Sequence, residues 1–353
     1  MKKIAAIILM MLIFTEVKAT DTSGIEQYSQ GFNFSEAVQS ITDGEYRFDI
    51  PHILNIICEK LLKAVKQNYS YAVILLAVAL FSAVAENIEK SFDAKNDITF
   101  FVFFTVIIIF GTNIFKQCMD LATETLDNLI LFVNALYPVM LTTVASGGMV
   151  AVASTLHPVL MYCGELVMLI IKTVIFPALS IGMALKIANL FSIDLQAERL
   201  GGLIDGFVKW TVGIMMTLFV GVVTVTGITA PTIDSVSIRA TKFAIGSFIP
   251  MVGNVISDSF DIIMNSSSVI KGSVGVAGLI NILFICFTPC ISLAAVSLAL
   301  NLCSALAEPV CNKKIVQLIG TFGKATFTMF GILCACACMF VLCTGVLVGT
   351  KAV

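Results

Sequence analysis

The chain is dominated by long apolar stretches that contain no charged residue. Asp, Glu, Lys and Arg are absent from Gln67–Ala85, Ile98–Phe115, Trp210–Ile233, Ser273–Ala307 and Ala325–Thr350. Between 129 and 185 only Glu165 and Lys172 are charged. A helix of roughly 20 apolar residues crosses the hydrocarbon core of a bilayer, because a helix satisfies its own backbone hydrogen bonds in lipid. The pattern therefore predicts an all-α, polytopic helical membrane protein.

The apolar stretches divide into about seven expected transmembrane helices. They lie at 68–86, 98–116, 129–150, 158–185, 207–231, 274–300 and 326–350. Pro177 lies inside the fourth and Pro289 near the middle of the sixth. Each proline indicates either a kink in a single span or the bend of a helical hairpin or re-entrant segment.

The N-terminus has the pattern of a secretory signal peptide at 1–19. Two lysines precede the apolar run Ile4–Phe14, which is too short to span, and Ala19 suits a signal peptidase. After cleavage, 20–66 would be an extracytoplasmic polar segment ending in an amphipathic helix that opens at Pro51. The rest, 67–353, is the expected multi-pass transmembrane domain.

The orientation of these spans conflicts with the positive-inside rule. With seven spans and a cleaved signal, most basic residues after the second span fall outside the cytoplasm, among them Lys186, Arg199, Lys313 and Lys324. Either the number of spans is off by one in the middle of the chain, or the second half has the opposite orientation.

Composition agrees with a membrane protein and excludes a nucleic-acid partner. The chain is 58% hydrophobic and 12% charged, with a mean hydropathy of +0.99. A soluble domain carries about 25% charged residues. The formal net charge of −2 provides no basic field for nucleic acid.

Catalytic and metal-binding motifs are not recognisable. The two histidines, His52 and His157, stand outside any zinc motif, and neither a Gly-rich phosphate loop nor a Gly-x-Ser-x-Gly elbow occurs. Most of the eleven cysteines lie in apolar runs, which is typical of small packing residues. We expect no enzymatic activity, no cofactor and no metal.

Glu165 and Lys172 are candidate pore-lining or intramembrane polar residues. They are seven positions apart and would share one helix face. Charges at such depth usually face the bundle or an aqueous cavity. The alternative is that each pairs with another helix and only fixes packing.

A second candidate surface follows Pro250. Asn254, Asp258, Asp261 and Asn265 are spaced to form one polar face of an amphipathic helix near 251–265, opposite apolar residues. Two acidic residues disfavour anionic lipid and favour a protein partner, although an ordinary helix that covers the bundle fits the pattern equally well.

The segment Ser237–Asp261 resembles the most distinctive part of the stage III sporulation protein AE family. Ser268–Gly278, Leu136–Met140 and the stretch from Ser146 to Pro158 fit the same family. The resemblance implies an endospore-forming bacterium and a place in the mother-cell membrane that engulfs the forespore, within a multiprotein, secretion-like channel. It implies as partners the other membrane proteins of the stage III sporulation operon, stage II sporulation protein Q from the forespore side, and membrane lipid.

We therefore expect a non-enzymatic component of the channel, needed for forespore development and late forespore gene expression. A secondary transporter or permease of a small solute is the alternative, because transporters often carry paired interrupted helices.

Overall fold

The computed structural model describes residues 33–42, 73–86, 88, 98–146, 148–191, 198–248 and 253–349. Within these ranges the side chains of 42, 98, 157, 198 and 227–268 are not described. The expected signal peptide, and the segment 20–66 apart from 33–42, lie outside the described residues.

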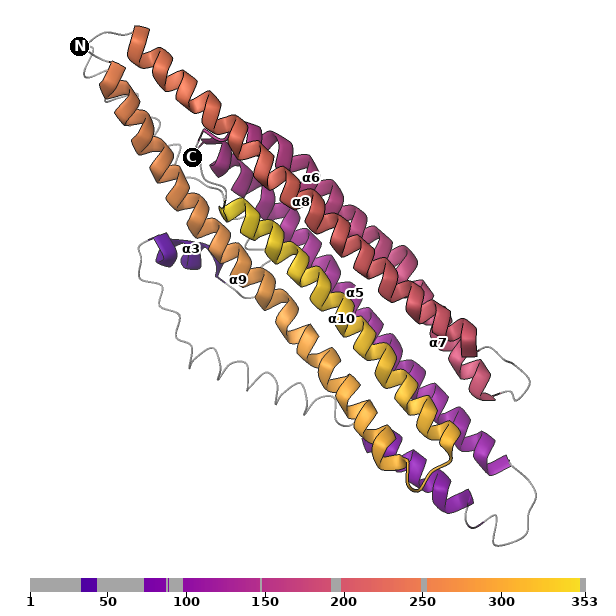
Figure 1. Ribbon diagram of the computed structural model, residues 1–353. Coiled ribbons are helices and arrows are strands. Elements are labelled where there is room, and N and C mark those ends of the chain that lie inside the picture. The colour runs from indigo at the N-terminus through magenta and orange to yellow at the C-terminus, as the bar shows by residue number, and fades with distance from the viewer. Residues whose placement is uncertain are drawn as a thin grey trace.

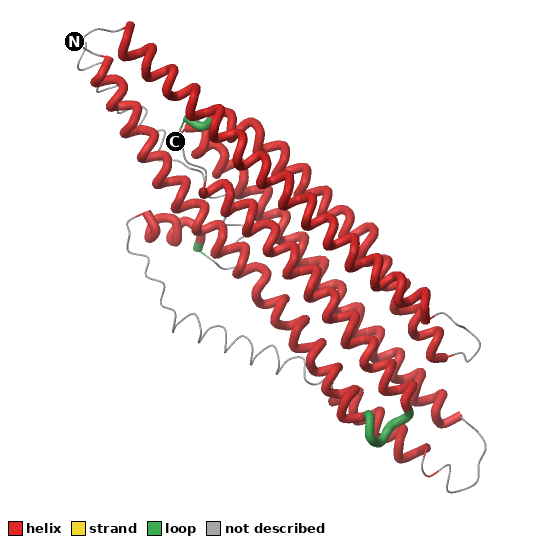
Figure 2. The backbone as a smooth tube through the Cα atoms, viewed as in Figure 1, coloured by secondary structure: helices red, strands yellow, loops and turns green. Residues whose placement is uncertain are grey.

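The described chain is almost entirely helical, as Figure 2 shows, and contains no strand. Its helices are α3 (Phe34–Thr42), α5 (Ile98–Ser146), α6 (Val150–Ile170), η1 (Ile171–Ile175, a π-helical turn), α7 (Phe176–Phe191), α8 (Glu198–Phe248), α9 (Gly253–Ala307) and α10 (Lys313–Gly349). A short apolar helix, Val73–Glu86, precedes α5. Five described helices are long and apolar enough to cross a bilayer, which confirms the all-α membrane class.

The long helices form an elongated antiparallel bundle (Figure 1). α10 packs against α9, α5, α8 and α7. α10 buries large apolar side chains such as Phe322, Met329 and Phe340 along its length. One face of α10 stays exposed, at residues such as Lys324, Phe327 and Leu342, while the other faces pack against its neighbours.

The expected spans 98–116 and 129–150 are not separate, because α5 runs through both without a break. The charged residues between them, Lys116, Asp120, Glu124 and Asp127, are spaced four, four and three apart and so lie on one helix face. No glycine or proline interrupts this stretch, and the helix continues with its charges turned to one side. With 49 residues, α5 is roughly 73 Å long, more than twice the roughly 30 Å hydrocarbon core.

Neither proline forms a hairpin. Pro289 lies inside the continuous α9, and Pro177 is the second residue of α7, just after the π-helical turn η1. A proline nitrogen carries no hydrogen and cannot donate the usual helical hydrogen bond. The extra residue of a π turn lets the helix continue past that missing bond. The prolines therefore lie in single continuous helices.

Close helix contacts are made at glycines. A Cβ built on Gly275 of α9 would lie 2.1 Å from Cγ2 of Val348 in α10, and one on Gly278 would lie 2.6 Å from Leu136 of α5. Small residues let membrane helices approach this closely.

α8 and α9 project beyond the rest of the bundle (Figure 1). Gly275 of α9 packs on Val348, next to the end of α10 at Gly349. The part of α9 before Gly275, beginning at Gly253, therefore lies beyond α10. We call this part of α9, together with the C-terminal part of α8 beside it, the projecting pair.

The short helix Val73–Glu86 is joined to the connection between α9 and α10. The Cys311 thiol donates to the carbonyl oxygen of Ala79 over 3.2 Å. Burial, and to a smaller extent the Glu86 carboxylate, raise the pKa of this thiol. Cys311 is therefore held in the protonated form that donates.

Candidate functional site

Lys172 forms an ion pair with Asp127. The amine on η1 contacts Oδ1 of the aspartate on α5, and both side chains are partly exposed. The pair joins two helices whose contributing residues are 45 positions apart in the sequence. The observed partner is the arrangement expected of a packing contact; the pore-lining role of Lys172 stays a prediction.

Glu165 lies on a different surface. It is exposed on α6, beside the exposed apolar residues Tyr162, Leu166 and Leu169. The π-helical turn between Glu165 and Lys172 begins at Ile171 and alters the register that a regular helix would give. Glu165 therefore faces outward from this chain, and its proposed role also stays a prediction.

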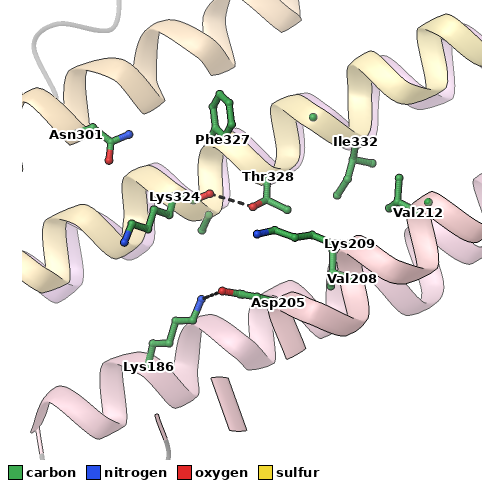
Figure 3. Close-up of a pocket in the computed structure, with 13 residues that line it drawn as sticks. Lys186, Asp205, Val208, Lys209, Val212, Asn301, Lys324, Phe327, Thr328 and Ile332 are labelled. Carbon is green, nitrogen blue, oxygen red and sulfur yellow. Dashed lines mark hydrogen bonds and ion pairs between the residues drawn. The ribbon is translucent and has the colours of Figure 1, made fainter. Parts of the chain in front are cut away.

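A cavity of about 530 Å³, with a mainly apolar lining and several polar side chains, lies where α7, α8, α9 and α10 meet. Figure 3 shows its polar side chains entering from four helices. They are Lys186 of α7, Asp205 and Lys209 of α8, Asn301 of α9, and Lys324 and Thr328 of α10. We call this the lysine cavity.

One of the three lysines in the cavity has a carboxylate partner. Lys186 Nζ and Asp205 Oδ2 are 2.5 Å apart, with the lysine side chain 24% and the aspartate 41% exposed. Among the described residues, no carboxylate pairs with Lys209 or Lys324. In Figure 3 the Lys209 side chain extends from α8 toward Thr328 of α10. The lining side chains therefore carry a net charge of +2.

The sequence alone did not predict that the residues of the lysine cavity lie close together. Lys209 and Lys324 each stand immediately before an uncharged stretch, 210–233 and 325–350, and this was the available signal. What placed them side by side is the parallel direction of α8 and α10 in the bundle.

Four cysteines meet between α9 and α10. The sulfur atoms of Cys290 and Cys334 are 3.7 Å apart, and Cys286 and Cys338 lie close to them. The residues of 334–338 alone could not form a compact group, but α9 brings a second pair against them. Within the described residues, no group of three or more His, Cys, Asp or Glu is arranged to hold a metal ion.

The candidate partner surface lies in the projecting pair. Asn254, Asp258, Asp261 and Asn265 all fall within α9, so the expected separate helix near 251–265 is its first part. Their side chains are outside the described part of the structure, and the polar face stays a prediction.

Comparison with known proteins gives one consistent match. The family profile described as stage III sporulation protein AE matches residues 32–351. A protein of Bacillus subtilis (strain 168) named stage III sporulation protein AE is 23% identical over 331 residues, which cover 93% of this chain and 82% of that protein. No solved structure matches the chain.

Proposed function

Because the chain belongs to the stage III sporulation protein AE family, we propose that it is a subunit of the multiprotein channel that connects mother cell and forespore. At the coarser level, the chain is a membrane protein of sporulation: the family match spans residues 32–351, and five described helices are long and apolar enough to cross a bilayer. The finer proposal puts it in the mother-cell membrane around the forespore.

The family match is the observation that carries this proposal, and the projecting pair supports it. The segment that most resembles the family, Ser237–Asp261, spans the end of α8 and the start of α9. Its described residues, 237–248 and 253–261, therefore lie at the tip of the projecting pair, where a neighbouring protein can reach them (Figure 1).

The partners proposed for this subunit are other stage III sporulation proteins of the same operon and stage II sporulation protein Q from the forespore side. The role is non-enzymatic: the chain contributes to the conduit or holds the other subunits.

Deletion of the gene tests the function. Vegetative growth should stay normal, while sporulation stops after engulfment begins, with small forespores and weak late forespore gene expression. A copy of the gene supplied elsewhere should restore spore counts. Wild-type spore counts in the deletion strain would contradict the proposal.

Purification from sporulating cells separates the channel from the transporter alternative. A channel subunit should copurify with several other sporulation proteins. A transporter should instead move a small solute by itself when reconstituted alone in liposomes, and its loss should impair vegetative growth.

A further inference from the structure

The lysine cavity has more positive charge than its own residues neutralise. Asp205 forms an ion pair with Lys186. Lys209 of α8 and Lys324 of α10 line the same cavity. The Thr328 hydroxyl donates to the Lys324 carbonyl oxygen, and the Asn301 amide donates to the Ser297 carbonyl oxygen. The two lysines are therefore the donors that face a ligand in this cavity. Two ammonium groups at one cavity, with six N–H donors between them, fit an anionic ligand with several oxygen acceptors.

The cavity lies at a boundary between polar and apolar chain. Lys209 is the last charge before the uncharged stretch 210–233 of α8, and Lys324 is the last before 325–350 of α10. Because α8 and α10 run in the same direction, both lysines mark the same level of the bundle (Figure 1). Lipid headgroups occupy such a level, where a transmembrane helix passes from apolar to charged residues.

A shallow apolar hollow on the surface of α8, which we call the α8 groove, continues from the cavity. A second hollow of about 540 Å³ is lined by Trp210, Ile214 and Leu218, and it shares Lys209 and Gly213 with the lysine cavity. Trp210 is 72% exposed on this face. A positively charged space that opens into an apolar groove matches a ligand with an anionic head and an apolar tail.

We propose that the lysine cavity binds the phosphate group of an anionic phospholipid, with an acyl chain along the α8 groove. Lys209 and Lys324 donate to the phosphate oxygens, and the Lys186–Asp205 pair keeps the aspartate from repelling the phosphate. Basic pockets between transmembrane helices bind anionic lipid headgroups in this way. This inference is independent of the proposed function, because it rests on the cavity and the groove alone.

Native mass spectrometry of the purified full-length protein with added phosphatidylglycerol tests the site. The variant Lys209→Gln with Lys324→Gln should bind this lipid roughly thirtyfold more weakly, since each lysine near an anionic lipid contributes about a factor of five. The matched control is Lys313→Gln with Lys314→Gln, which removes two lysines of α10 that do not line the cavity. Equal binding by the variant and the control would overturn the proposal, as would equal binding of zwitterionic phosphatidylcholine by the unaltered protein.

Two further arms cover misfolding and the source of the phosphate. Lys209→Arg with Lys324→Arg keeps both charges and should retain the lipid, which separates lost binding from lost fold. Gly213→Leu places a side chain in the groove, at a position where a Cβ meets nothing within 4 Å. This variant should bind phosphatidylglycerol more weakly, but inorganic phosphate should change its unfolding temperature as it does that of the unaltered protein. If inorganic phosphate stabilises the protein as much as the lipid does, and Gly213→Leu changes neither, the site binds free phosphate and the lipid proposal fails.

Discussion

The ion pair between Lys172 and Asp127 links η1 to α5 through a single side chain on each helix. Each side chain lies in a predominantly apolar helix, and each supplies the counter-charge that the other needs. The sequence identified Lys172 because it is one of two charges in 57 residues, 129–185. It could not identify Asp127 as the partner, because that pairing depends on how η1 packs against α5.

Charge reversal at this pair should change the amount of protein in the membrane. Lys172→Asp leaves two carboxylates together and should cost about 2–3 kcal/mol, with lower abundance on immunoblots of membranes. Combining it with Asp127→Lys restores an opposite-charge pair and should recover most of that loss. Glu165→Gln, on the exposed face of α6, is the control and should leave abundance unchanged. A double variant no more abundant than the single one would mean that the pair does not hold the helices together.

Among the elements, α5 was the hardest to predict. Its two apolar halves look like separate spans, since four charges intervene between them. Whether such charges form a loop or one face of a continuous helix depends on the surface they meet, which hydropathy does not measure. The other long apolar helices were recognisable because their uncharged stretches are bounded on both sides by charged residues.

Packing of α9 on α10 should fail if its close contact is filled. Gly275→Val pushes side-chain atoms into Val348 and should destabilise the protein by about 1–3 kcal/mol, seen as a lower unfolding temperature in detergent. Gly272→Val lies one turn earlier on the same helix, where a Cβ meets nothing within 4 Å, and should have little effect. Equal shifts in both variants would show that valine disturbs the helix itself and not the contact.

The first part of α9 should be the element that a partner recognises. Asp258→Lys with Asp261→Lys should leave membrane insertion and abundance intact but weaken copurification of other sporulation proteins, because charge complementarity is reversed. Glu308→Lys, after the opposite end of α9, is the matched control. If the double variant assembles and sporulates normally, this segment does not bind a partner and only covers the bundle.

For the whole molecule, the continuity of α5 removes one of the expected crossings, which reverses the expected side of every later loop. The end of the bundle that carries the α7–α8 and α9–α10 connections gathers Lys186, Arg199, Lys209, Lys313, Lys314 and Lys324. The sequence between the apolar parts of α8 and α9 holds Arg239, Lys242 and Lys271. The positive-inside rule then predicts that the lysine-rich end faces the cytoplasm and the projecting pair faces outward.

Cysteine labelling tests that orientation. Val150→Cys and Val310→Cys lie at opposite ends of the bundle, and both valines are exposed. With the protein expressed in vegetative cells, a membrane-impermeant maleimide should modify Cys at 150 in intact cells and Cys at 310 only after lysis, with the modified site identified by mass spectrometry. Labelling of the 310 variant in intact cells would invert the predicted topology.

The projecting pair gives the molecule a mechanical lever. About 20 residues of α9 beyond the end of α10 form a rod of roughly 30 Å at about 1.5 Å per residue. A tilt of about 10° at its base would displace its tip by about 5 Å, close to the one-turn shift by which packed helices change register. We therefore expect a partner that binds the tip to bear on the α9–α10 contact at Gly275, and a small change at that contact to give a larger displacement at the tip.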